Sequence, residues 1–107
     1  MLKKVNRLAK DKDIQKTFAR GRAFFSPFFT VKYLSGGENV RFTVVVSTKV
    51  SKRAVVRNRL KRLVREYLRI NIKDFKKGDH VLTVKPKAVS LPEDQLIPNL
   101  KKLFNNK

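Results

Sequence analysis

The apolar positions between Ser51 and Arg69 recur with the period of an α-helix. On a wheel that advances about 100° per residue, with Arg57 at zero, one stripe is apolar and the opposite stripe carries basic side chains and an asparagine. Arg59 stands apart from both stripes. The apolar stripe consists of Val56, Leu60, Leu63, Val64 and Tyr67. We therefore predict a helix that starts near Ser51 or Lys52, ends near Arg69, docks its apolar face on a sheet and turns a cationic face outward.

Aromatic and β-branched residues favour a first strand across residues 24–34. Pro27 has no backbone donor, so we expect an edge strand or a bulged one. Residues 35–39 have the composition of a turn, and a second strand, Val40–Ser47, follows them. Val45 interrupts the alternation of apolar and polar residues there, which indicates a central strand covered on both faces.

A third strand and two further helices complete the pattern. The third strand, His80–Val84, is separated from the second by the basic helix, so these two strands can be parallel neighbours. Asp11 can cap a first helix that runs to about Arg20 and stops at Gly21. We expect the last helix to start near Asp94 or to be kinked, because a proline inside a helix, here Pro98, costs about 3 kcal/mol.

The order α-β-β-α-β-α predicts an α+β fold, in which helices and a sheet form packed layers. The 107 residues fit a single domain, residues 1–107, and a hydrophobic content of 41% suffices for a modest core. Residues 1–10 are basic with scattered apolar positions, and we expect an extended or mobile arm there.

The net charge narrows the class of partner. With 27 Lys and Arg against 8 Asp and Glu, the chain carries +19, and such self-repulsion opposes a compact state unless a polyanion neutralises it. Nucleic acid is the first candidate and an anionic membrane the second. No apolar run approaches the roughly 18 residues that span a bilayer. The first residues lack the apolar stretch of a secretory signal, and the absence of cysteine suits the cytoplasm.

The cationic stripe of the predicted helix is poorly explained as a solvated face. Stabilising pairs four residues apart need opposite charges, whereas Arg57, Lys61 and Arg65 follow one another at that spacing, and like charges cost roughly 0.2–0.5 kcal/mol per pair. A membrane-surface helix would show its apolar face to lipid, but here the sheet needs that face. We therefore expect the stripe to bind phosphates, which suit the planar guanidinium of arginine.

Candidates for catalysis are few. His80 is the single histidine, which excludes a pair of histidines acting as acid and base, and beside a β-branched strand we expect a structural role for it. The close acid pairs, Asp11/Asp13 and Glu93/Asp94, stand near predicted helix starts, where carboxylates favour the macrodipole, so capping is a better interpretation than Mg²⁺ binding. We predict no catalytic residue and no metal site in the chain itself.

The segment Ser47–Glu66, STKVSKRAVVRNRLKRLVRE, resembles the signature of the bacterial ribonuclease P protein component, whose hallmark is an Arg-Asn-Arg run. Arg57-Asn58-Arg59 matches that run. Arg7–Gly21 resembles the first helix of the family and His80–Pro86 its last strand, so the resemblance covers roughly the whole chain. It implies a ribosomal-protein-like α/β sandwich, with the basic helix in the crossover between two parallel strands.

The resemblance also implies a role. The family's protein binds a large catalytic RNA, and the holoenzyme hydrolyses precursor tRNA to release its 5′ leader. Catalysis would belong to the RNA and to Mg²⁺, bound mainly by the RNA and the substrate, and neither a membrane nor a small-molecule substrate is implied. The residues that would bind the catalytic RNA are Lys49, Lys52, Arg53, Arg57, Asn58, Arg59, Lys61, Arg62, Arg65 and Arg69. The residues that would line a cleft for the single-stranded leader, between the first helix and the sheet, are Ile14, Phe18, Lys32, Lys61 and Arg65.

Two of these cleft positions depart from the pattern of the family. Ile14 stands where relatives often carry another aromatic residue and Lys32 where some carry tyrosine, so leader binding would depend more on charge than on rings. Phe18 either stacks on a base, for about 1–3 kcal/mol, or packs in the core. Four further rings could compensate, with core or edge packing as their alternative: Phe24, Phe25, Phe28 and Phe29. Two other functions stay open, namely a ribosomal or other structural RNA-binding protein without a role in tRNA processing, and a self-sufficient nuclease.

Overall fold

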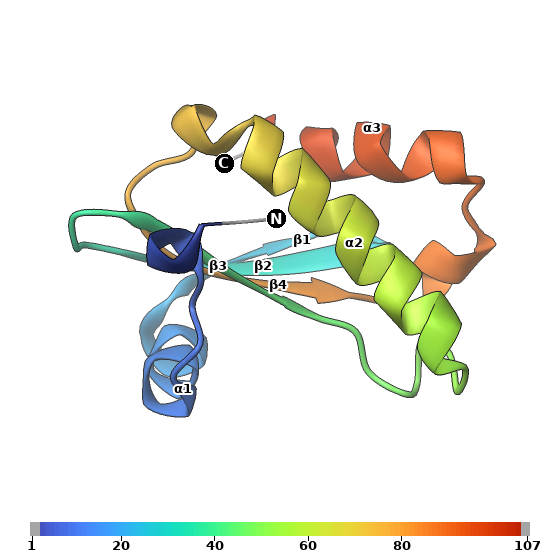
Figure 1. The fold of residues 1–107 in the computed structure, drawn as a ribbon, viewed down its shortest axis with the longest axis horizontal. Coiled ribbons are helices and arrows are strands. Elements are labelled where there is room, and N and C mark those ends of the chain that lie inside the picture. The colour runs from blue at the N-terminus through green and yellow to red at the C-terminus, as the bar shows by residue number, and fades with distance from the viewer. Residues whose placement is uncertain (1–2, 106–107) are drawn as a thin grey trace.

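The computed structural model describes residues 3–105, whose course is drawn in Figure 1. The elements in chain order are η1 (Lys4–Asn6), α1 (Asp11–Arg20), β1 (Arg22–Phe25), β2 (Phe29–Ser35), β3 (Val40–Val45), α2 (Ala54–Ile70), η2 (Ile72–Asp74), β4 (Gly78–Val84), η3 (Pro86–Ser90) and α3 (Glu93–Asn105), where η marks a 3-10 helix. The predicted order of helices and strands is recovered, with one additional strand. The α+β prediction is therefore confirmed.

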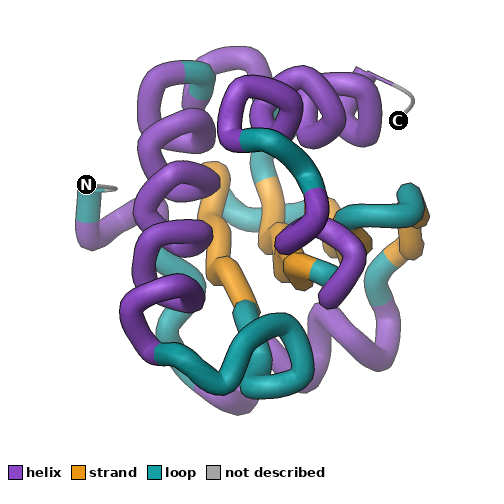
Figure 2. The backbone as a smooth tube through the Cα atoms, turned by 90° about the vertical axis from the view of Figure 1, so that its right-hand side faces the viewer, coloured by secondary structure: helices purple, strands orange, loops and turns teal. Residues whose placement is uncertain are grey.

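Within residues 3–105 the four strands form one mixed sheet in the order β1-β2-β4-β3. β2 pairs with β1 and with β4 in antiparallel fashion, whereas β3 and β4 run parallel. Parallel neighbours need a crossover connection, and α2 supplies it, as predicted. α2 and α3 cover one face of the sheet and α1 lies on the other (Figure 1), so that the strands run between the helices (Figure 2).

The hydrophobic core lies between the sheet and the pair α2 and α3. Successive side chains of a strand point to opposite faces, and on this face alternate residues of β2, β3 and β4 are buried. The strand residues of the core are Phe29, Val31, Val40, Phe42, Val44, Leu82 and Val84. The helices contribute Val64, Leu68, Leu96, Leu100, Leu103 and Phe104. Each fully buried aliphatic or aromatic side chain contributes about 1.5–3 kcal/mol, which is what holds the basic helix α2 on the sheet.

Residues 24–34, predicted as one strand, form a hairpin of β1 and β2 instead. The hydroxyl of Ser26 accepts hydrogen bonds from the backbone N–H of Phe28 (3.3 Å) and Phe29 (3.0 Å) and so closes the reversal. Pro27 lies in this turn, where its missing N–H leaves no ladder position empty. The prediction of a single strand was wrong because the turn has only three residues, 26–28, and these hardly change the aromatic and apolar composition of the stretch.

β3 is an edge strand, so the prediction of a central strand was wrong. β4 lies between β2 and β3, and alternation along β3 is regular, with Val44 buried and Val45 half-buried. The N-terminal segment covers part of the outer edge of β3. Arg7 forms an isolated parallel β-bridge with Phe42, and the backbone N–H of Leu8 donates to the carbonyl of Phe42 at 2.8 Å. Leu8 is only 2% exposed, so this part of the predicted arm is fixed to the sheet.

The helix ends differ from the predictions in detail. Asp11 is the first residue of α1 and not its cap, because Lys10 occupies the cap position and makes no side-chain capping bond. α2 starts at Ala54, later than predicted, since the preceding residues form a loop. α3 starts at Glu93 and keeps Pro98 in its interior. Periodicity thus predicted each helix, and the starts of α1 and α3 lie within one residue of the predicted ones, whereas the start of α2 lies two or three residues later.

Candidate nucleic-acid interface

α2 docks on the sheet through a stripe centred on Val64 and Leu68, both fully buried. Leu60, Leu63 and Tyr67 are partly buried beside them. The buried stripe is rotated around the helix axis relative to the predicted apolar stripe, because it includes Leu68, which the predicted stripe did not contain. As a result Lys61, predicted on the outward stripe, is half-buried at the border of the docked face, and so is Arg57, which the wheel places between the two stripes. The two-faced character of the helix is confirmed, and its orientation on the sheet is corrected.

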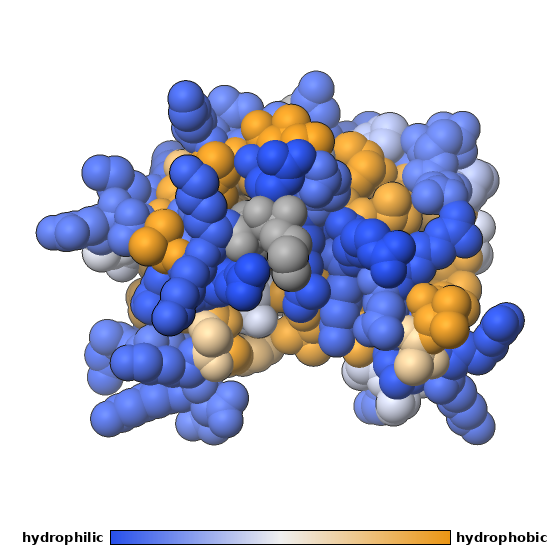
Figure 3. All heavy atoms as spheres, viewed as in Figure 1, coloured by the Kyte–Doolittle hydropathy of each residue, from blue (hydrophilic) through white to orange (hydrophobic). Residues whose placement is uncertain are grey.

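The outward face of α2 is cationic. Asn58, Arg62 and Arg65 are exposed, and among residues 3–105 neither Arg62 nor Arg65 takes part in an ion pair. The exposed cations that precede the helix are Lys49, Lys52 and Arg53. Figure 3 shows hydrophilic side chains over much of this side of the molecule. Such a face offers guanidinium groups that need not break an internal pair before they meet a phosphate.

Two arginines of α2 are already paired with acids. Arg59, which the wheel sets apart, forms an ion pair with Glu93 in the first turn of α3, and Arg69 pairs with Glu66 on α2 itself. The hydrogen bond from Arg69 lowers the pKa of Glu66 below its usual value and raises the pKa of Arg69. The charge of both arginines is therefore partly compensated, and Arg59 also connects α2 to α3.

Arg57, which opens the Arg-Asn-Arg run, organises the loop before the helix. Its Nη1 donates to the backbone carbonyl of Ser51 at 2.8 Å, and the hydroxyl of Ser51 accepts from the backbone N–H of Arg53 at 3.2 Å. The three residues of the run thus have different surroundings, because Arg57 holds a loop, Asn58 is exposed and Arg59 pairs with α3.

Arg65 lies where α2 meets the edge of the sheet. It lines a groove of about 280 Å³ together with Arg7 and Leu8 of the N-terminal segment and Thr43 of β3. Arg7 is a second guanidinium in this groove that sequence reasoning did not assign to a site. No local pattern could have found it, because only the bridge between Arg7 and Phe42 brings the arm to this edge.

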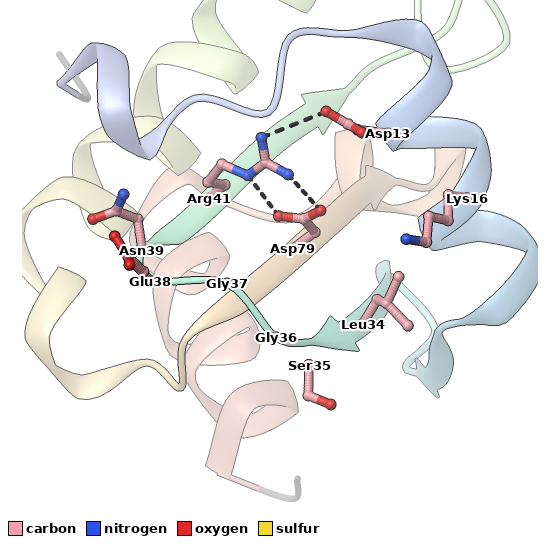
Figure 4. A pocket seen from close by; sticks show the side chains of 10 residues that line it. All are labelled: Asp13, Lys16, Leu34, Ser35, Gly36, Gly37, Glu38, Asn39, Arg41 and Asp79. Atoms are coloured by element: carbon pink, nitrogen blue, oxygen red, sulfur yellow. Dashed lines mark hydrogen bonds and ion pairs between the residues drawn. The ribbon is translucent and has the colours of Figure 1, made fainter.

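Arg41 anchors α1 to the opposite face of the sheet, as the close view in Figure 4 shows. Its Nε and Nη2 donate to the two carboxylate oxygens of Asp79 at 2.7 and 2.8 Å, and its Nη1 lies 3.5 Å from a carboxylate oxygen of Asp13 on α1. The hydrogen bond to Asp79 raises the pKa of Arg41. A groove of about 420 Å³ separates these side chains and Lys16 from the turn of residues 35–39.

The anchoring determines which flank of α1 faces the rest of the sheet. Thr17 is fully buried, with its hydroxyl donating to the carbonyl of Asp13 at 2.9 Å. At about 100° per residue, Asp13 and Lys16 lie on one side of Thr17, and Ile14 and Phe18 lie on the other. Because Asp13 and Lys16 face the groove beside the turn, Ile14 and Phe18 border the part of the sheet that α1 leaves uncovered. Phe18 is 43% exposed, which excludes plain core packing.

The uncovered part of the sheet, here called the open sheet face, consists of half-buried residues whose side chains point away from the core. Lys32 is in register with Val81, and Val81 with Thr43. A second row, parallel to the first, joins Thr30 of β2, Thr83 of β4 and Val45 of β3. The open sheet face comprises Thr30, Lys32, Thr43, Val45 and Thr83. The threonines were not predicted as site residues, because pairing between distant strands decides which of them share a face.

The structure brings only some of the predicted cleft residues together. Ile14 and Phe18 border the open sheet face that contains Lys32, and Arg65 reaches its edge beside Thr43. Lys61 lies half-buried on α2, which covers the other face of the sheet (Figure 1). Contact between Lys61 and a strand on the open sheet face would therefore have to pass around the edge of β3.

The remaining chemistry-bearing residues have structural surroundings. His80 is fully buried, its ring stacks on Phe42 with 4.4 Å between centroids, and its Nε2 lies 3.1 Å from the carbonyl of Lys76. This burial and stacking fit the structural role expected for His80. In the part of the chain that the structure describes, no three His, Cys, Asp or Glu side chains cluster as metal ligands would, and no helix is long and apolar enough to cross a membrane.

Comparison with known proteins gives a consistent result. The family model of ribonuclease P matches residues 2–107. The ribonuclease P protein component of Exiguobacterium is 34% identical over 104 residues, which cover 96% of this chain and 90% of the relative, and that of Bacillus velezensis is 34% identical over 105 residues with the same coverage. The solved ribonuclease P protein of Thermotoga maritima has 28% identity, a TM-score of 0.82 and coverage of 94% of this chain and 96% of that one. The Staphylococcus aureus ribonuclease P protein, at 23% identity, has a TM-score of 0.90 over 95% of this chain and 94% of that one, and so shares the fold. The chain therefore belongs to the ribonuclease P protein family.

Proposed function

We propose that the outward face of α2 binds the catalytic RNA of ribonuclease P, so that the chain acts as the protein subunit of this endoribonuclease. Membership of the family implies a role in an endoribonuclease complex with an RNA partner. The observation that supports α2 as the contact is its division into a buried stripe and a cationic face on which Arg62 and Arg65 have no acid partner among residues 3–105. The proposed contacts are Lys49, Lys52, Arg53, Arg57, Asn58, Arg59, Lys61, Arg62, Arg65 and Arg69.

The open sheet face is the proposed site for the single-stranded 5′ leader of precursor tRNA. Phe18 offers an exposed ring on which a base can stack. Lys32 supplies a cation on the strands, and Arg65 supplies another at the edge of β3. Threonine hydroxyls between them can donate to phosphate or sugar oxygens. Ile14 offers apolar contact without a ring, so charge and hydroxyl groups would contribute more to leader binding than stacking.

The chemistry of cleavage would be carried by the RNA and by Mg²⁺ bound mainly to the RNA and the substrate. Several carboxylates of the described residues are engaged with an arginine: Asp79 by Arg41, Glu93 by Arg59 and Glu66 by Arg69. A carboxylate in such a pair does not fit a dedicated metal site. The chain's own contribution would be to position the leader and to neutralise phosphates. We propose that it does so in the cytoplasm.

A comparison of precursor and mature tRNA tests this proposal, with the full chain reconstituted with the ribonuclease P RNA. Phe18→Ala is expected to weaken binding of precursor tRNA by about 1–3 kcal/mol and to leave binding of mature tRNA unchanged, because mature tRNA has no leader. Equal losses for both RNAs would contradict the leader site. The alternative of a structural RNA-binding protein without a role in tRNA processing is not favoured by the comparisons; it predicts no preference for precursor over mature tRNA.

A further inference from the structure

Phe25, the last residue of β1, is an aromatic side chain left in solvent. Its side chain is 69% exposed. Beside it, the ammonium group of Lys85 lies 5.7 Å from the centre of the ring. That ammonium group also donates to the backbone carbonyl of Ser26 at 2.7 Å, and the backbone N–H of Lys85 donates to the carbonyl of Phe28 at 2.8 Å. The cation is therefore held in place next to an open ring.

The register of the sheet puts Phe25 on the open sheet face. Phe25 is opposite Thr30, Thr30 is opposite Thr83, and Thr83 is opposite Val45. Residues directly opposite each other in a sheet point to the same face. Phe25 thus ends a row that crosses all the strands from the edge of β3 to the edge of β1, a distance of about 14 Å for three steps between neighbouring strands.

Phe25 differs in this respect from its neighbours on the hairpin. Lys87 lies 5.9 Å from the ring of Phe28, and Arg22 lies 5.9 Å from the ring of Phe24. Both of these rings are partly buried against the hydrophobic core, so less of each ring is open to a ligand than of Phe25. Among the three ring–cation pairs of the hairpin, that of Phe25 and Lys85 alone combines an exposed ring with a fixed positive charge.

We propose that Phe25 and Lys85 form a second stacking position for single-stranded RNA, at the edge of the open sheet face farthest from Arg65. The ring would stack on a base and the ammonium group would meet the neighbouring phosphate. The inference rests on the proposed function, because it extends the path of the leader across the whole sheet. A second copy of the chain does not fit the same surface, since both copies carry a net charge of +19.

The consequence is a dependence on leader length. A short leader reaches Phe18 and the nearer strands, whereas a longer one crosses the sheet to Phe25. Phe25→Leu keeps an apolar side chain and removes the ring, and Phe25→Tyr keeps the ring, so the two variants form a matched pair. Lys85→Gln removes the charge without touching the ring. Because Phe25 is exposed, its replacement leaves the core unchanged.

The experiment measures affinities of the reconstituted holoenzyme for precursor tRNAs with leaders from about two to about ten nucleotides, spanning the lower range of known single-strand site sizes. For the longer leaders, Phe25→Leu is expected to weaken binding by about 5-fold or more, and Phe25→Tyr to bind as the unchanged chain does. Lys85→Gln is expected to reduce the salt slope for long leaders by about 0.7. The affinity for mature tRNA should stay constant in all three variants.

The inference is overturned if Phe25→Leu binds long leaders as the unchanged chain does, or if it weakens mature tRNA equally. Phe18→Ala in the same series separates the two proposals. A loss with Phe18→Ala but not with Phe25→Leu removes only the second stacking position, whereas no loss with either variant removes the leader site as a whole. Thermal unfolding of each variant verifies the fold, and Lys85→Gln keeps the test decisive should a ring variant unfold.

Discussion

Replacing Arg62 by alanine removes one exposed guanidinium from the outward face of α2, and its effect can be worked out from the surroundings of the helix. Among the described residues Arg62 has no ion pair, so its whole charge is available to a phosphate. Each phosphate contact on a duplex contributes about −0.9 to the slope of log affinity against log salt. Between about 50 and about 200 mM salt, one contact therefore accounts for about a 3.5-fold loss of affinity.

Arg59→Ala, the matched control on the same helix, should have a smaller effect. Glu93 already compensates the charge of Arg59, so we expect less than half of the change in slope that Arg62→Ala produces. The assay is a filter-binding or fluorescence titration of the ribonuclease P RNA with each variant at a series of salt concentrations. An unchanged slope for Arg62→Ala would remove the outward face of α2 from the interface, and equal changes for both variants would show that Glu93 does not compensate Arg59 in solution.

Three further predictions concern single side chains. Glu93→Gln should release Arg59, steepen the salt slope by up to about 0.9 and raise affinity for the RNA; a slope like that of the unchanged chain in the same titration would contradict this. Arg41→Met should lower the free energy of unfolding in urea by about 1–2 kcal/mol. Hydrogen bonds between charged groups contribute about 1.5–3 kcal/mol, and solvent screens part of the pair with Asp79 because Arg41 is 34% exposed. No change in the urea midpoint would mean that the pair is solvated. Gly78→Ala should destabilise the fold by more than about 1 kcal/mol, because Gly78 has a φ of +139° and a Cβ there would lie 2.5 Å from a carbonyl oxygen of β2; an unchanged melting temperature would contradict the observed backbone.

The sequence allowed most of the fold to be predicted where the signal is local. The wheel for Ser51 to Arg69 identified a docked and a cationic face, and Arg59 was separated from both before its partner Glu93 was known. The helix between the second and third strands predicted their parallel pairing. These predictions succeed because the period of apolar residues is set by the face that a helix or strand buries.

The predictions fail where contacts between distant segments decide the outcome. Val45 suggested a central strand, but the order of strands puts β4 in that place. The open sheet face and the row that ends at Phe25 follow from the register of three strand pairs, which no local pattern contains. Arg7 was missed for the same reason, since the groove beside it depends on which elements pack together. Leu68 is different, because it follows Val64 by four residues, so the helical period itself indicates that the two share a buried face.

The most direct test of the central claim is cleavage of precursor tRNA by the ribonuclease P RNA at low Mg²⁺ and physiological salt, with and without the chain. We expect the unchanged chain to increase the rate of cleavage and to produce the mature 5′ end, and a chain that carries Arg62→Ala together with Arg65→Ala to lose most of this increase. Cleavage that is equally fast with and without the unchanged chain would contradict the account.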